Sequence, residues 1–121
     1  MGQTILLVED HQDTANAFMR MLRRDGYDVT IASTAARALE LCGTQAFDLL
    51  ICDINLPDGN GAEILKVARQ YHVQTRGIIV SGHDEPEYLK AARDAGFSKI
   101  FLKPIDYISL RQALRELLLG A

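Results

Sequence analysis

The 121-residue sequence has little of what marks several special classes of protein. Its only two cysteines, Cys42 and Cys52, lie in apolar stretches, which favours buried, reduced packing residues over a disulfide or a redox site. No apolar run approaches the roughly 18 residues of a membrane-spanning helix, so we expect no membrane insertion. The N-terminal MGQTILLVED has no basic region before an apolar one, so we expect no signal peptide and a cytoplasmic location. A net charge of −3 gives no electrostatic basis for direct binding of nucleic acid.

What the sequence does contain is an alternation of short apolar runs with amphipathic segments. The expected strands are Ile5–Val8, Val29–Ala32, Leu49–Cys52, Ile78–Val80 and Ile100–Leu102. Most of these runs lack period-two alternation, which is typical of strands covered on both faces. Between them, apolar residues recur at helical spacing, as in Ala15, Phe18 and Leu22. Five such units predict an α/β doubly wound (βα)5 fold, in which a parallel five-stranded sheet of order 2-1-3-4-5 lies between two helical layers. We expect this flavodoxin-like three-layer sandwich to form one domain over residues 1–121.

Polar side chains follow four of the five expected strands. Glu9 and Asp10 come after the first strand, Asp53 after the third, Ser81 after the fourth and Lys103 after the fifth. Because the carboxyl ends of parallel strands share one edge of the sheet, where such folds bind ligands, we expect these groups to converge. Two carboxylates about 4 Å apart repel each other by about 4 kcal/mol at an effective dielectric constant near 20. The acidic cluster should therefore either raise a pKa or hold a hard cation such as Mg²⁺.

Four motifs in order, VED, DINLPDGNG, VSG and FLKP, resemble those of the receiver domain of two-component response regulators. The resemblance covers essentially the whole chain. It implies a signalling domain that accepts a phosphoryl group from a histidine kinase or a histidine phosphotransfer domain. Such a domain assists its own phosphorylation and autodephosphorylation and is not an enzyme with a separate substrate. The resemblance also implies Mg²⁺ as the cofactor, with Mn²⁺ or Ca²⁺ as possible substitutes.

The resemblance gives roles to the residues around the acidic cluster. Asp53 corresponds to the phosphoacceptor. Asp10, Asp53 and the backbone carbonyl of Asn55 would bind the metal ion, and Glu9 would act mainly through water. Lys103 would pair with a phosphoryl oxygen as a point charge.

Further roles concern the response to phosphorylation. Ser81 would donate its hydroxyl to the phosphoryl group, and with Phe101 it would switch the surface formed by the fourth helix, fifth strand and fifth helix. Asn55 and His83 occupy the positions that tune dephosphorylation in this family. The resemblance further implies a cis peptide bond between Lys103 and Pro104, which would aim the lysine.

Other functions remain open at this stage. A phosphatase of the haloacid dehalogenase type also uses an aspartate nucleophile with Mg²⁺, but it requires a second aspartate where this chain has Asn55. A flavin binder of the same fold needs a hydroxyl-rich loop where EDHQD stands, and a degenerate receiver would bind partners without phosphorylation. The downstream output is not specified. The segment GFSKIFLKPIDYISLRQAL resembles receivers attached to hybrid histidine kinases, which favours that origin over a stand-alone regulator or another fused output.

The three histidines, His11, His72 and His83, are scattered along the chain and show no metal-ligand spacing. We therefore expect them to be surface or loop residues, apart from the tuning role suggested for His83.

Overall fold

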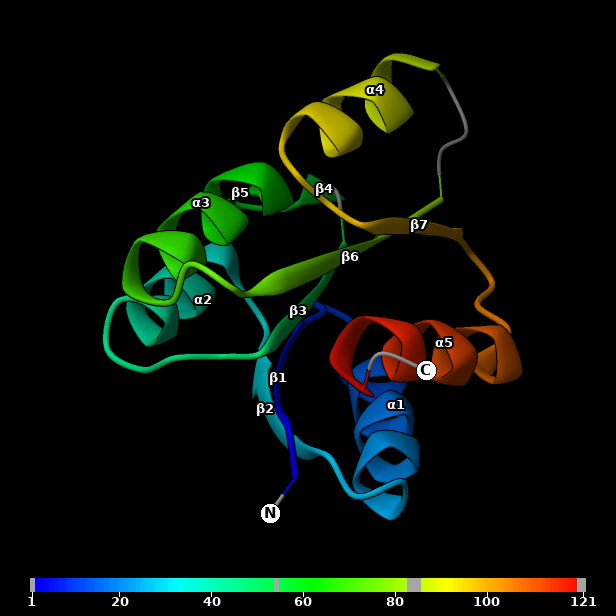
Figure 1. The fold of residues 1–121 in the computed structure, drawn as a ribbon. Coiled ribbons are helices and arrows are strands. Elements are labelled where there is room, and N and C mark those ends of the chain that lie inside the picture. Colours follow the sequence, from blue (N-terminus) through cyan, green and yellow to red (C-terminus); the bar gives the residue numbers. More distant parts are fainter. Residues whose placement is uncertain (1, 54, 83–85, 120–121) are drawn as a thin grey trace.

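A parallel sheet flanked by helices forms the centre of the computed structural model, which describes residues 2–53, 55–82 and 86–119 (Figure 1). Its strands are β1 (Thr4–Val8), β2 (Asp28–Ala32), β3 (Leu49–Asp53), β6 (Arg76–Ser81) and β7 (Lys99–Leu102). They pair in the order β2-β1-β3-β6-β7. Counted along the chain without the two short strands described below, this is the order 2-1-3-4-5, so the predicted topology is confirmed.

In the described part of the chain, five α-helices connect and cover these strands. They are α1 (Gln12–Arg24), α2 (Ala35–Cys42), α3 (Gly61–Tyr71), α4 (Pro86–Asp94) and α5 (Tyr107–Leu114). A π-helical segment, Arg115–Leu119, continues directly from α5. Over the described ranges, no helix combines the length and apolar character needed to cross a membrane.

The sheet divides the apolar interior into two layers. Neighbouring residues of β1 point to opposite faces, so Leu6 packs in the layer with α2, α3 and α4, whereas Ile5 packs in the layer with α1 and α5 (Figure 1). Ile64 of α3 and Leu110 of α5 are fully buried, one in each layer. Burial on both faces explains why the strands read as continuous apolar runs.

The segment after β3 holds two short strands that are not among the strands expected from the sequence. It contains β4 (Asn55–Leu56) and β5 (Gly59–Asn60), which pair as a small antiparallel ribbon. Strands of two residues are too short to produce a periodic pattern, so the sequence gives no signal for them. Directly afterwards, the side-chain oxygen of Asn60 accepts a hydrogen bond from the backbone N–H of Glu63 at 3.1 Å, so Asn60 is the N-cap of α3.

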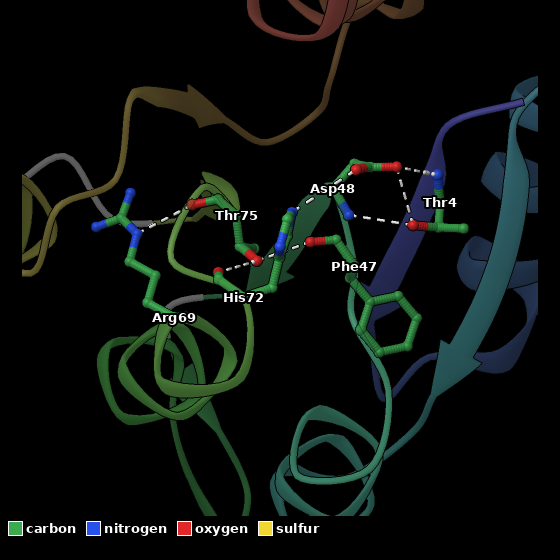
Figure 2. A network of polar contacts seen from close by, with 6 residues as sticks. All are labelled: Thr4, Phe47, Asp48, Arg69, His72 and Thr75. Carbon is green, nitrogen blue, oxygen red and sulfur yellow. Dashed lines mark hydrogen bonds and ion pairs between the residues drawn. The ribbon is translucent and has the colours of Figure 1, made fainter.

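A polar network joins the amino-terminal ends of the strands, at the edge of the sheet opposite to the carboxyl ends where Glu9 and Asp53 lie (Figure 2). The hydroxyl of Thr75, a residue only 1% exposed, lies 2.7 Å from the carbonyl oxygen of Phe47 and 2.8 Å from that of His72. The imidazole of His72 is 3.9 Å from the carboxylate of Asp48, which accepts hydrogen bonds from the backbone N–H and the hydroxyl of Thr4. These contacts tie the start of β6 to the starts of β3 and β1, at the end of the sheet opposite to Glu9, Asp10 and Asp53.

Candidate functional site

Lys103 lies between two acidic side chains at the carboxyl edge of the sheet. Its Nζ atom is 2.7 Å from Oδ2 of Asp53 and 3.6 Å from Oε1 of Glu9. Asp53 is the last residue of β3, Glu9 follows β1 and Lys103 follows β7, so three strands bring together groups that are distant in sequence. The acidic side chains are largely buried, with 13% of Asp53 and 8% of Glu9 exposed. The contact between Lys103 and Asp53 is therefore a charge-assisted hydrogen bond in a partly desolvated place.

A second cluster stands where β1 leads into α1. The Nδ1 atom of His11 is 3.4 Å from Oδ1 of Asp10 and 3.6 Å from Oε2 of Glu9. One potential ligand atom from each residue lies within 4.8 Å of the others. The sequence pattern does not indicate that His11 lies beside these two carboxylates, although its side chain is exposed as expected. The signal that could have found this was its position directly after Glu9 and Asp10, because three consecutive donors can converge without any longer spacing.

The charge balance of this edge favours a cation. Glu9, Asp10 and Asp53 supply three carboxylates, whereas Lys103 supplies one ammonium group, so formal negative charge is in excess. The pKa of Asp10 is lowered chiefly by a hydrogen bond with Glu9, which outweighs the opposing effect of burial. Burial lowers the pKa of Lys103, but the hydrogen bond and negative charge of Asp53 and the charge of Glu9 raise it overall. The lysine therefore stays charged at neutral pH.

Glu9, Asp53 and Lys103 border a cavity at this edge of the sheet. A cavity of about 490 Å³ has Glu9, Asp53 and Lys103 in its wall, together with apolar residues from the sheet and from α1 and α5. A small anionic group has room to approach Asp53 from this side. The oxygen-rich donor set also suits Mg²⁺, which prefers carboxylate, carbonyl and water ligands.

Ser81 and Phe101 belong to the two strands at the far side of the site. Ser81 ends β6 with no exposed surface, and its carbonyl oxygen accepts a hydrogen bond from the backbone N–H of Lys103 at 2.8 Å. Phe101 of β7 is partly buried against the layer formed by α1 and α5. The peptide bond between Lys103 and Pro104 is cis, the isomer that the sequence resemblance implies. His83, expected to tune dephosphorylation, lies outside the described residues.

Asp58 anchors the segment that follows Asp53. Its carboxylate accepts hydrogen bonds from the backbone N–H groups of Ala35 at 2.8 Å and Ala36 at 3.0 Å. These hydrogen bonds to the start of α2 lower the pKa of Asp58. The ribbon that begins at Asn55 is thereby held against a helix terminus, where a carboxylate is favoured. Sequence reasoning did not find this link, because it joins residues that are adjacent only in the fold.

Fold and site together define a flavodoxin-like α/β domain with an acidic, lysine-containing edge. Residues 5–115 match the sequence profile of the response regulator receiver domain. The chain therefore belongs to the receiver domain family of two-component signal transduction.

Known relatives support this assignment. The sporulation initiation phosphotransferase F of Bacillus subtilis is 26% identical over 118 residues, which cover 98% of this chain and 95% of that protein. A CheY-like receiver domain from Methanospirillum hungatei superposes with a TM-score of 0.92 at 29% identity, over 99% of this chain and 96% of that one. The receiver domain of the sensor histidine kinase PA1611 of Pseudomonas aeruginosa, with magnesium coordinated in its active-site cleft, gives a TM-score of 0.86 at 25% identity with both chains fully covered. Several other curated relatives are longer transcriptional regulators, of which the chain spans between 24% and 49%.

Proposed function

We propose that Asp53 accepts a phosphoryl group from the phosphohistidine of a histidine kinase or a histidine phosphotransfer domain. The observation that carries this proposal is the 2.7 Å contact between Nζ of Lys103 and Oδ2 of Asp53, beside the acidic pair Glu9 and Asp10. It supplies a carboxylate nucleophile with a fixed positive charge next to it. In this proposal the domain assists its own phosphorylation and autodephosphorylation and acts on no separate substrate.

Mg²⁺ is the proposed cofactor of this site, with Mn²⁺ or Ca²⁺ as substitutes. Asp10, Asp53 and the backbone carbonyl of Asn55 would hold the ion, with Glu9 acting mainly through water. This donor set contains only oxygen, as hard divalent cations prefer, and the excess negative charge of the edge favours their binding. When bound, the ion supplies neutralisation of charge on the phosphoryl oxygens. Magnesium in the cleft of the PA1611 receiver domain supports this choice.

The residues of the chain account for the transfer step. A carboxylate oxygen of Asp53 attacks the phosphorus atom, a new O–P bond forms, and the N–P bond breaks with its electron pair returning to the donor imidazole. The ammonium group of Lys103 pairs with a phosphoryl oxygen and stabilises the charge that develops there. Ser81 donates its hydroxyl to another phosphoryl oxygen, and movement of Phe101 then changes the surface of α4, β7 and α5. Asn55 and His83 would set the rate of dephosphorylation.

The proposed partners follow from the role of Asp53 as a phosphoryl acceptor. The donor is a histidine kinase or a histidine phosphotransfer domain in the cytoplasm, and the partner downstream is unassigned. We favour the receiver of a hybrid histidine kinase, because the PA1611 receiver matches the whole chain and comes from a sensor kinase. A stand-alone regulator is the second candidate, supported by the near-complete coverage of the sporulation phosphotransferase.

Phosphorylation by a small donor tests the acceptor directly. We expect the protein incubated with acetyl phosphate and Mg²⁺ to gain the mass of one phosphoryl group, measured by intact mass spectrometry. Asp53→Asn should gain none, and chelation of the metal should prevent the gain in wild type. Asp94→Asn is the matched control, because Asp94 is an exposed residue of α4 paired with Lys90, and it should behave as wild type.

Two results would overturn the acceptor assignment. One is the absence of any adduct on the wild-type protein. The other is an undiminished adduct on Asp53→Asn. The first result would favour a partner-binding receiver that is not phosphorylated.

A further inference from the structure

The imidazole of His11 adds a nitrogen donor to the acidic pair Glu9 and Asp10. The Nδ1 atom lies 3.4 Å from Oδ1 of Asp10 and 3.6 Å from Oε2 of Glu9. Two ligands bound at about 2.0–2.1 Å to one tetrahedral Zn²⁺ ion are about 3.4 Å apart. The Nδ1 atom of His11 therefore lies from each carboxylate at about the distance that separates two ligands of such an ion, and one potential ligand atom from each of the three residues lies within 4.8 Å of the others.

The nitrogen donor changes which ions the cluster prefers. Mg²⁺ selects oxygen ligands, whereas imidazole suits Zn²⁺, Cu²⁺ and Ni²⁺, whose affinities for mixed nitrogen and oxygen sites are far higher. Access is open, because 74% of the His11 side chain and 32% of the Asp10 side chain are exposed. Glu9 is buried and fixed in place, with its Oε2 atom 3.3 Å from the backbone nitrogen of His11. A water molecule can complete the fourth position on the exposed side.

We propose that Glu9, Asp10 and His11 form a binding site for a borderline transition-metal ion of the Zn²⁺ class, overlapping the magnesium site at Asp10. Since one carboxylate is shared, the two ions exclude each other. The regulatory part of this inference rests on the proposed function. A Zn²⁺ ion held by His11 would keep Mg²⁺ away from Asp53 and so block phosphoryl acceptance.

The metal-binding part can be tested without any phosphoryl donor. We expect isothermal titration of the metal-free protein with Zn²⁺ to give one site, and His11→Gln to bind at least about tenfold more weakly. His72→Gln is the matched control and should keep the wild-type affinity, because His72 lies at the other end of the sheet. Electron paramagnetic resonance of bound Cu²⁺ should show nitrogen coupling from one imidazole, which His11→Gln removes. Equal Zn²⁺ affinity in wild type and His11→Gln, or the absence of a Zn²⁺ site, would refute the proposal.

The overlap with the magnesium site has its own readouts. Raising the Mg²⁺ concentration should weaken the apparent Zn²⁺ affinity of wild type, and Zn²⁺ should lower the phosphoryl adduct in wild type far more than in His11→Gln. Zn²⁺ binding that is indifferent to Mg²⁺ would contradict the overlap. Asp53→Asn separates the two proposals, because we expect it to retain Zn²⁺ binding through the imidazole while accepting no phosphoryl group. If the wild type is not phosphorylated but binds Zn²⁺ through His11, the metal site stands and the acceptor assignment falls.

Discussion

Replacing Thr75 by valine should destabilise the fold without changing the chemistry of the site. Valine keeps nearly the same volume but has no hydroxyl, so the carbonyl oxygens of Phe47 and His72 lose the group that lies 2.7 and 2.8 Å away (Figure 2). Leaving a buried polar group without its hydrogen bond costs about 1–3 kcal/mol. In a domain of this size, each kcal/mol lowers the melting temperature by about 3–5 °C.

Urea unfolding followed by circular dichroism would measure this change in the free energy of unfolding. Thr75→Ser is the control, because it keeps the hydroxyl and loses only one methyl group, worth about 0.8 kcal/mol. The phosphoryl adduct formed well below the melting temperature should be the same in all three proteins, since Thr75 lies at the opposite end of the sheet from Asp53. A loss below about 0.5 kcal/mol for Thr75→Val would refute the reasoning, because ordinary surface substitutions have effects of that size.

Two further predictions concern residues at the ends of helices. Asn60→Ala should lower the free energy of unfolding by about 1 kcal/mol through loss of the N-cap of α3, whereas Asn60→Ser should retain most of it in the same urea assay. Burial and a hydrogen bond to Asp25 raise the pKa of Tyr107 above its usual 10.0, so the folded state holds this proton more tightly than the unfolded chain. Stability should therefore fall as pH rises from 10 toward the raised pKa, and Tyr107→Phe should reduce that slope in unfolding experiments between pH 9 and 12. If Tyr107→Phe leaves the pH dependence of the free energy of unfolding unchanged, Tyr107 is not the group responsible for it.

The sequence predicts the sheet because its strands are buried on both faces. Each expected strand lies within an observed one, and the observed strands extend it by one residue at one end, except that β6 adds residues at both. Apolar runs of this kind are a direct consequence of packing helices on two sides. Right-handed crossovers and two helical layers require the strand order to reverse, and 2-1-3-4-5 is one of the orders that meet this requirement.

Other features depend on contacts that no local pattern records. The hydrogen bonds of Asp58 to the start of α2 join segments more than twenty residues apart, and the hydroxyl of Thr75 is buried only because two chain segments meet there. The proximity of Lys103 to both Asp53 and Glu9 could be expected from the parallel topology, but not the distances. For His11, the direction of the ring decides its partners, and sequence spacing says nothing about that direction.

The separation of the interior into two layers has a consequence for how such a domain can change. Residues such as Ile64 and Leu110 lie on opposite faces of the sheet and belong to different apolar clusters. Substitutions that are distant and share no neighbours usually have additive effects on stability. The helices on one face can therefore accumulate changes and acquire new surfaces while the other face keeps the strands in register. The acidic edge depends on where the strands end, so we expect such substitutions to leave its residues in place.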